Sequence, residues 1–295
     1  MKITANEIIQ MADNIWTCII EFASWEAVKN FVNSEFTIAL IGSCAGAFAG
    51  AVAAQRINER NKRRDELLQE LRNTNAGIAI ALGICNSFLA INKQYIIDLK
   101  KFDCQKDELI SFLQRQETGE VSRDSVFNFM ADLRTLQFQS FPNDILRTIV
   151  FERLSLTGKP LNLIEVIVQT TQCLNESIRY RNNLLENYKV RFANENKEFI
   201  YLYFGLPYAN NRVNRDYSDL INAIYNQTND GIFFSQLLCR DLHKHGNQLM
   251  EEFRKKFKKD VPSVSEVDFR TVIAEGLMPN EKDYDDWTKA FSTKE

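Results

Sequence analysis

The chain has 295 residues, of which 45% are hydrophobic and 25% charged, and it contains only 11 glycines and 5 prolines. This composition excludes collagen-like, low-complexity and mostly disordered proteins. The 36 basic and 39 acidic residues leave a net charge of −3, so no overall positive field steers the chain towards nucleic acid. Because glycine and proline are scarce, long helices are favoured over a strand-rich sandwich or barrel.

The sequence contains no recognisable pattern of catalytic or metal-binding residues. Its six cysteines are scattered without a CxxC pair, and its two histidines are His243 and His245. A spacing of two residues places these histidines on different faces of a helix, whereas a helical metal site uses positions i and i+4. Phosphate loops, nucleophile elbows and HExxH motifs are missing from the sequence. We therefore expect a non-enzymatic protein without a cofactor, in a reducing compartment.

Residues 1–35 form the first predicted segment, an amphipathic N-terminal helix. Apolar residues recur near helical spacing from Ala5 to Val32, and acidic residues interrupt them. Trp16 and Trp25 suit the outer membrane interface, where indole rings are favoured. Because the acidic charge disfavours anionic lipids, packing of this helix within its own oligomer is an equal alternative.

Residues 36–55, FTIALIGSCAGAFAGAVAAQ, carry no charged side chain. Twenty residues in a helix span about 30 Å, which matches the hydrocarbon thickness of a bilayer. We therefore predict a single transmembrane helix. A cleaved signal peptide is disfavoured because the preceding segment is long and acidic. A soluble core helix is the other alternative, because many alanines and glycines make insertion only modestly favourable.

The charges that flank residues 36–55 are asymmetric. The preceding segment has two lysines and five acidic residues, whereas five basic residues and only Glu59 follow between residues 56 and 64. The positive-inside rule places the N-terminus outside and the remainder in the cytoplasm, as in a single-pass protein of the inner membrane. The basic residues predicted to contact lipid head groups are Arg56, Arg60, Lys62, Arg63 and Arg64.

Three glycines, Gly42, Gly46 and Gly50, repeat every four residues and form two consecutive GxxxG units. In a membrane, apolar burial does not itself drive helices together, so a smooth face of small residues favours close approach of backbones. We expect these glycines to form a helix–helix interface between copies of the chain. Packing against a different span, or mere composition, is the alternative.

Residues 56–102 are predicted to form a long juxtamembrane stalk helix, because apolar residues recur in sevens along them. Arg64 and Asn92 interrupt this seam, which favours a helical bundle or a short coiled coil over an extended zipper. Residues 73–92 again lack charge, but polar residues shorten their apolar part to 76–85, about half a bilayer. A buried core helix is therefore preferred there to a second or re-entrant span.

Residues 103–295 are predicted to form a cytoplasmic helical domain, so the expected fold class is all-α: a transmembrane helix, a long helix and a helical bundle. Breaks fall at 158–160 and 205–207, and the FIYLYF run before the second break is either a short strand or a buried helix end. The expected helices are Glu108–Gln116, Ser122–Gln139, Asn143–Ser155, Leu161–Asn194, Tyr217–Asn229, Ile232–Lys259, Ser263–Glu275 and Glu281–Phe291.

Two charged segments of this domain have alternative interpretations. The basic run near residue 256 suits a helix C-terminus electrostatically; alternatively it contacts anionic lipid heads or nucleic-acid phosphate, helped by Phe253 and Phe257. The acidic and aromatic residues 283–287 form either a docking tail or a solvated last turn. The basic run comprises Arg254, Lys255, Lys256, Lys258 and Lys259.

Together these features predict a non-enzymatic, single-pass membrane protein that self-associates and couples a cytoplasmic sensing or interaction domain to the membrane. A bacterial defence or stress effector that perturbs the membrane has this layout. A membrane-tethered scaffold that recruits a cytoplasmic protein is the alternative, and a hydrolase or nuclease with dispersed carboxylates ranks third. The expected partners are the membrane, further copies of the chain and a cytoplasmic protein, with nucleic acid disfavoured.

Overall fold

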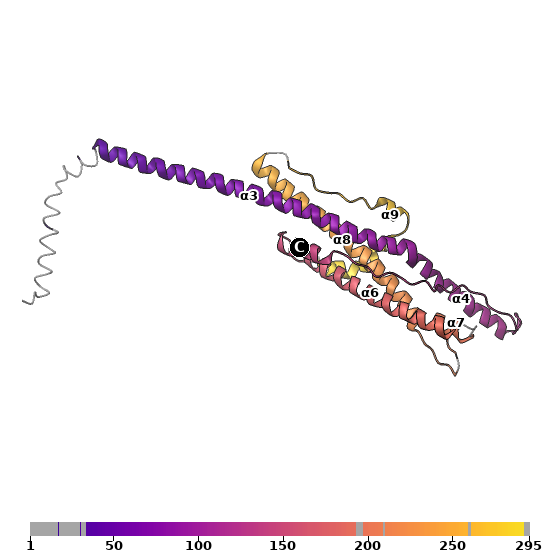
Figure 1. Ribbon diagram of the computed structural model, residues 1–295. Coiled ribbons are helices and arrows are strands. Elements are labelled where there is room, and N and C mark those ends of the chain that lie inside the picture. The colour runs from indigo at the N-terminus through magenta and orange to yellow at the C-terminus, as the bar shows by residue number, and fades with distance from the viewer. Residues whose placement is uncertain are drawn as a thin grey trace, which may run out of the picture. The chain divides into compact units, whose positions relative to one another are not determined.

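The described part of the chain is helical and contains no β-strand, which confirms the predicted all-α class (Figure 1). An isolated bridge between Tyr208 and Arg212 is its only β-type pairing. The predicted amphipathic helix lies outside the described residues, apart from Thr17 and Asn30. The computed structural model describes Thr17, Asn30 and residues 34–192, 197–208, 210–258 and 261–291.

Two compact units make up the chain, Met1–Asp65 and Glu66–Glu295. Helix α3, Glu35–Ile91, contributes residues to both units. Ser34 caps its start, because the Thr37 N–H donates to Ser34 Oγ over 3.2 Å. The boundary between the units falls inside residues 56–102, the predicted stalk.

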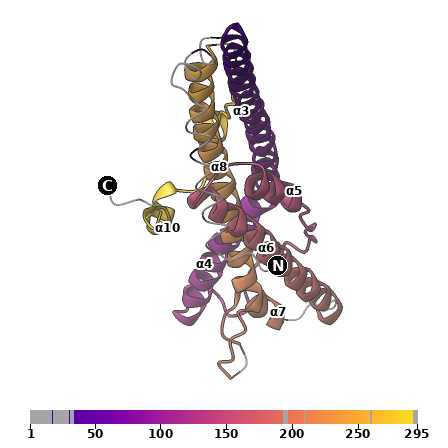
Figure 2. The same cartoon turned by 90° about the vertical axis from the view of Figure 1, so that its left-hand side faces the viewer.

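The second unit contains most of the helices (Figures 1 and 2). After α3 the chain forms a π-helix, η1, and then α4; a second π-helix, η2, follows the short α5. The FIYLYF run lies in α7 and is helical, not a strand. The bounds are η1 Asn92–Ile96, α4 Ile97–Glu117, α5 Asn143–Arg147, η2 Thr148–Glu152, α6 Lys159–Arg191, α7 Lys197–Phe204, α8 Asp216–Phe257, α9 Arg270–Ala274, 3₁₀-helix η3 Glu281–Tyr284 and α10 Asp285–Lys289.

The core of the second unit lies between α3, α6 and α8. Buried leucines and isoleucines recur every three or four residues along α6, so one face of that helix is apolar and the other faces water. The Cys85 and Cys239 thiols donate to Ile232 O and Ile78 O, which ties α3 to α8 in both directions. The buried residues of α6 are Leu163, Ile164, Ile167, Val168, Thr170, Thr171, Leu174, Ser177, Ile178, Arg181, Leu185 and Tyr188.

Helix α8 runs without interruption through Asn229–Asp230–Gly231, where the sequence analysis separated two helices. That separation is wrong, because Gly231 is a contact point instead of a break. A Cβ atom at Gly231 would lie 2.3 Å from the ring of Phe88 on α3, whose side chain is 0% exposed. The missing side chain therefore lets the two helices approach closely around the phenylalanine ring.

One helical stretch of the described chain, Ala39–Glu117, is long and apolar enough to cross a membrane by length and composition alone. Half of its 18 most apolar consecutive residues are buried. Because no residue between 39 and 66 is buried, these 18 residues extend into the part of α3 that lies in the core of the second unit. Residues 73–92 belong to this part, where Ile78 and Ile84 are both buried.

The predicted helix Ser122–Gln139 is wrong, because a turn at residues 123–124 is followed by a non-helical, extended stretch. Phe127, Phe129, Ala131 and Leu133 pack against the core, and Asn128 and Met130 between them are exposed, so the apolar period over this part is two and not 3.6. The predicted helix Ser263–Glu275 is also largely wrong. Its first part is extended, and only Arg270–Ala274 is α-helical.

Candidate functional site

The first candidate surface is the start of α3, in the first unit. From Ala39 to Gln55 its residues are exposed except for half-buried Val52. Leu40, Ile41 and Phe48 are 50%, 59% and 73% exposed. A continuous apolar surface of this kind marks contact with a membrane or another protein.

The glycines of this helix form an open face. A Cβ atom added at Gly42, Gly46 or Gly50 would meet no atom within 4 Å. Ser43, the hydroxyl residue within the apolar stretch, donates to Leu40 O over 2.9 Å and so satisfies its hydrogen bond inside the helix. The geometry leaves the face accessible for close helix packing.

The predicted basic cluster follows directly on the same helix. Arg56, Arg60, Lys62 and Arg63 are exposed, and half-buried Arg64 pairs with Asp65 over 3.1 Å. These side chains cover roughly two helical turns. Dense positive charge therefore follows directly on the apolar stretch of α3.

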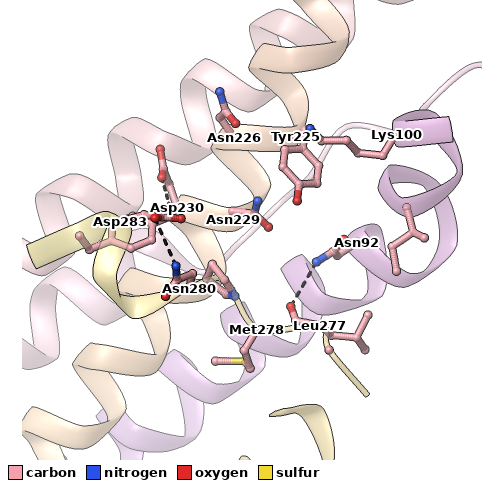
Figure 3. A pocket seen from close by; sticks show the side chains of 14 residues that line it. Asn92, Lys100, Tyr225, Asn226, Asn229, Asp230, Leu277, Met278, Asn280 and Asp283 are labelled. Carbon is pink, nitrogen blue, oxygen red and sulfur yellow. Dashed lines mark hydrogen bonds between the residues drawn. The ribbon is translucent and has the colours of Figure 1, made fainter. Parts of the chain in front are cut away.

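The second candidate is a pocket in the second unit, lined by η1, α4, α8, η3 and the segment before η3 (Figure 3). It has a volume of about 740 Å³. Asn92, the first residue of the π-helix, is buried, and its Nδ2 donates to Leu277 O over 3.2 Å. π-Helices occur frequently at functional sites, because they displace side chains from their α-helical positions.

Charged and amide groups surround this pocket. The Lys100 ammonium lies 4.3 Å from the centroid of the Tyr225 ring, a cation–π arrangement. The Tyr284 hydroxyl donates to Asp230 Oδ1 over 2.8 Å. Burial raises the pKa of Asp230, and the hydrogen bond from Tyr284 opposes this rise. The side-chain amides of Asn226 and Asn229 complete a lining that suits a small polar ligand with both donors and acceptors.

The pocket leaves no contiguous pattern in the sequence, because three distant segments of the chain build it. The only local sign is the polar run 226–230, NQTND, within the otherwise amphipathic α8. The missed lining residues are Asn92, Ile97, Lys100, Tyr225, Asn226, Asn229, Asp230, Gly276, Leu277, Met278, Pro279, Asn280, Asp283 and Tyr284.

The basic run at the end of α8 lies at a helix C-terminus, as the electrostatic interpretation requires. Arg254, Lys255 and Lys256 are in the last turn, Lys258 caps the helix at a φ of 50°, and Lys259 lies outside the described residues. The suggested help from Phe253 and Phe257 in lipid contact is wrong. Both rings are buried, 3% and 9% exposed, in a small cluster with Leu67, Leu71 and Leu249.

His245 and Glu70 belong to a polar contact between α8 and α3. His245 Nε2 lies 3.1 Å from Glu70 Oε1, and the same oxygen accepts from Ser155 N over 2.8 Å and from Ser155 Oγ. The serine hydroxyl thus faces the carboxylate and not the imidazole. A general base needs the reverse order, with histidine between serine and acid, so this contact joins helices and does not activate a nucleophile.

Within residues 283–287 the two aromatic rings pack on α8, whereas Asp283, Asp285 and Asp286 are exposed, as the solvated-turn alternative expects. The Tyr284 ring stacks on Phe233 with centroids 3.8 Å apart and an 8° angle between planes. The Trp287 ring meets Phe234 edge-on at 4.9 Å. The C-terminal wall of the pocket is thereby held against α8.

Comparisons with protein-family models, curated proteins and solved structures found no match for this chain. The exposed stretch of α3 and the pocket at Asn92 are therefore the features that bear on its function.

Proposed function

We propose that the chain is a non-enzymatic, single-pass protein of the inner membrane that self-associates and couples a cytoplasmic helical bundle to the membrane. The observation that carries this proposal is the exposed, uncharged stretch of α3 from Ala39 to Gln55, which the basic cluster follows at once. Burial of this helix in lipid removes its apolar side chains from water. The basic cluster then lies at the cytoplasmic head groups, and the N-terminus lies outside.

The cytoplasmic part acts as the sensing and interaction domain. Its pocket begins at Asn92, the residue that follows the last residue of α3. A ligand that binds there acts on the same continuous helical path that carries the apolar segment. Such a ligand shifts the equilibrium between two conformations of the protein by as much as its binding free energy differs between the two conformations.

Membrane fractionation tests the anchoring. We expect the full chain to stay in the membrane pellet after an alkaline wash, and the double variant Ile41→Arg with Phe48→Arg to leave it. Each arginine near the centre of a span opposes insertion by about 2.5–3.5 kcal/mol. The control is Val190→Arg, which charges an apolar residue that is 82% exposed on α6.

Two outcomes would contradict the proposal: a soluble wild-type chain, or a double variant that remains in the pellet.

Reporter fusions at residues 30 and 295 then test the orientation. We expect an external reporter at the first position and a cytoplasmic reporter at the second, by the charge asymmetry.

Self-association is tested with the variant Gly46→Leu. We expect at least a tenfold loss of dimer signal in a membrane reporter assay, because leucine holds the two backbones apart. The matched control is Cys44→Leu, two residues away on the opposite side of the helix. No atom lies within 4 Å of a Cβ at Gly46, so the substitution leaves the described packing intact. Equal association of the two variants would rule out the glycine face.

A further inference from the structure

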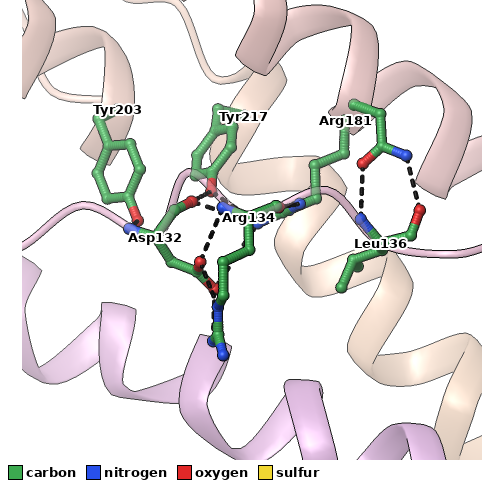
Figure 4. A network of polar contacts seen from close by, with 7 residues as sticks. Asp132, Arg134, Leu136, Arg181, Tyr203 and Tyr217 are labelled. Atoms are coloured by element: carbon green, nitrogen blue, oxygen red, sulfur yellow. Dashed lines mark hydrogen bonds and ion pairs between the residues drawn. The ribbon is translucent and has the colours of Figure 1, made fainter. Parts of the chain in front are cut away.

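A long extended segment, residues 126–139, crosses the second unit between α4 and α5, and we call it the strap. Within the described chain, the strap makes no hydrogen bond from main chain to main chain. Its main-chain groups bond instead to side chains of α6, α7 and α8 (Figure 4). We call the surface that these side chains form the groove.

Two asparagines of α6 each hold both main-chain groups of one strap residue. Asn182 Oδ1 accepts from Leu136 N over 3.0 Å, and Asn182 Nδ2 donates to Leu136 O over 2.8 Å. Asn175 makes the same pair of bonds with Gln139, at 2.7 and 2.8 Å. Seven residues separate the asparagines, so they lie on the same face of α6. These amides recognise an extended backbone regardless of the side chain it carries.

Three further groove residues recognise the backbone of the preceding part of the strap. Arg181 Nη1 donates to Arg134 O over 2.7 Å, and Asp132 N donates to the Tyr203 hydroxyl over 3.0 Å. Asp132 O accepts from the Tyr217 hydroxyl over 3.2 Å. The contacted residues 132, 134 and 136 lie on one edge of an extended chain, as in the pairing of a β-strand.

Along residues 126–131 the strap's side chains alternate between the core and the solvent, and in the second half of the strap Leu136 is the buried residue, 5% exposed. Phe127, Phe129 and Leu133 pack inwards, whereas Val126 and Met130 are 77% and 84% exposed. The groove therefore accepts apolar side chains at alternate positions in the first half of the strap and at Leu136 in the second half. This is the pattern by which an extended peptide is held through its backbone and selected through its alternate residues.

The strap does not satisfy the groove completely. Arg181 is 0% exposed, yet its Nε has no hydrogen-bond partner. The Asp132 carboxylate lies 3.8 Å from the Arg181 guanidinium and instead accepts its short hydrogen bonds from Arg134. A buried donor without an acceptor is rare in native proteins and points to an occupant that supplies one.

We propose that this groove is a binding site for an extended polypeptide segment of a partner protein, and that the strap is its displaceable resident. The partner segment carries apolar residues at the positions that Phe127, Phe129, Leu133 and Leu136 occupy in the strap, and an acceptor that reaches Arg181. This inference does not depend on the membrane anchoring proposed above, because every residue that carries it lies in the second unit.

The probe is a fluorescent synthetic peptide of residues 124–141, added to the full chain. A tethered strap acts at an effective concentration of about 1 mM, so the wild-type groove binds the peptide weakly. The variant Leu136→Asp loosens the strap, because it places a charge at a buried position. We expect this variant to bind the peptide at least tenfold more tightly than the wild type does.

Groove substitutions in the Leu136→Asp background test the mechanism. Truncation of Asn175 and Asn182 to alanine is expected to weaken peptide binding at least tenfold. The matched control Asn183→Ala, at the exposed neighbour of Asn182 on α6, is expected to change it less than twofold. Failure of the folded Leu136→Asp chain to bind, or equal binding after truncation of Asn175 and Asn182, would overturn the proposal.

A second measurement decides the matter if Leu136→Asp does not fold. Hydrogen exchange of the wild-type chain is followed with several millimolar peptide, which competes with the tethered strap. Faster exchange at Leu136 and Gln139 with peptide is the expected result. Unchanged protection of these amides at the same peptide concentration would overturn the proposal.

Discussion

Replacement of Asp132 by alanine is expected to lower the free energy of unfolding by about 3 kcal/mol, because it leaves the buried guanidinium of Arg181 without its nearest negative charge. This is the lower end of the range for a broken buried ion pair. The pair is 3.8 Å apart, and Arg181 keeps hydrogen bonds to the carbonyls of Asp132 and Arg134. Urea unfolding of the full chain measures the change.

Two further variants distinguish the loss of the ion pair from the loss of any acidic residue in this connection. Arg181→Met is expected to cost less than Asp132→Ala, because Asp132 still accepts three hydrogen bonds from Arg134 and is 21% exposed. Asp124→Ala removes an exposed acid from the same connection and is expected to change stability by less than about 0.5 kcal/mol. A cost for Asp132→Ala as small as that for Asp124→Ala would show that the ion pair contributes nothing.

Acid adds a second test of the same pair. Burial raises the pKa of Asp132, but hydrogen bonds from Arg134 and the positive charges of Arg181 and Arg134 outweigh it and leave this pKa below its ordinary value of 3.8. The carboxylate therefore stabilises the fold above about pH 4, and this contribution is lost as the pH falls through the lowered pKa. The stability difference between the wild type and Asp132→Asn is expected to shrink below pH 4.

Replacement of Phe88 by alanine is expected to cost about 3–5 kcal/mol, because its fully buried ring fills the contact between α3 and α8. The ring also lies 4.8 Å from that of Phe141. Gly231→Ala is expected to cost about 1–3 kcal/mol through overpacking against the same ring. This cost exceeds the roughly 1 kcal/mol that alanine gains over glycine inside a helix. Thermal or urea unfolding measures both variants.

Gly83→Ala is the matched control, since a Cβ atom there meets nothing within 4 Å. It is expected to stabilise α3 by up to about 1 kcal/mol. In the double variant Gly231→Ala with Phe88→Leu, the smaller side chain is expected to recover part of the overpacking cost. Equal effects of Gly231→Ala and Gly83→Ala would contradict the close approach of the helices.

The helical class and the course of α6 follow from the spacing of apolar residues along the sequence. The break within α8 was wrongly predicted because an isolated glycine has the same local appearance whether it ends a helix or admits a neighbouring ring. The strap was wrongly predicted because it has apolar residues at several helical spacings as well as at alternate ones. Its extended form depends on Asn175 and Asn182, which lie 36 and 46 residues away. No local pattern contains this information.

The two candidate surfaces also differ in how far the sequence alone locates them. The apolar helix and its basic cluster are contiguous, so residues 36–64 suffice to locate them. The pocket needs the π-helix at Asn92, the polar run of α8 and the C-terminal segment to meet. A π-helix has no composition of its own, and Tyr284 and Trp287 reach Phe233 and Phe234 only through the fold.

The paired amide contacts of the strap also bear on how this protein can evolve. Because Asn175 and Asn182 bond main-chain atoms, they tolerate any residue except proline at Leu136 and Gln139, as far as these hydrogen bonds are concerned. Outward positions such as Met130 are constrained still less. Selection on the strap therefore acts on its inward apolar residues, while the outward residues are free to drift and to acquire new contacts without loss of the fold.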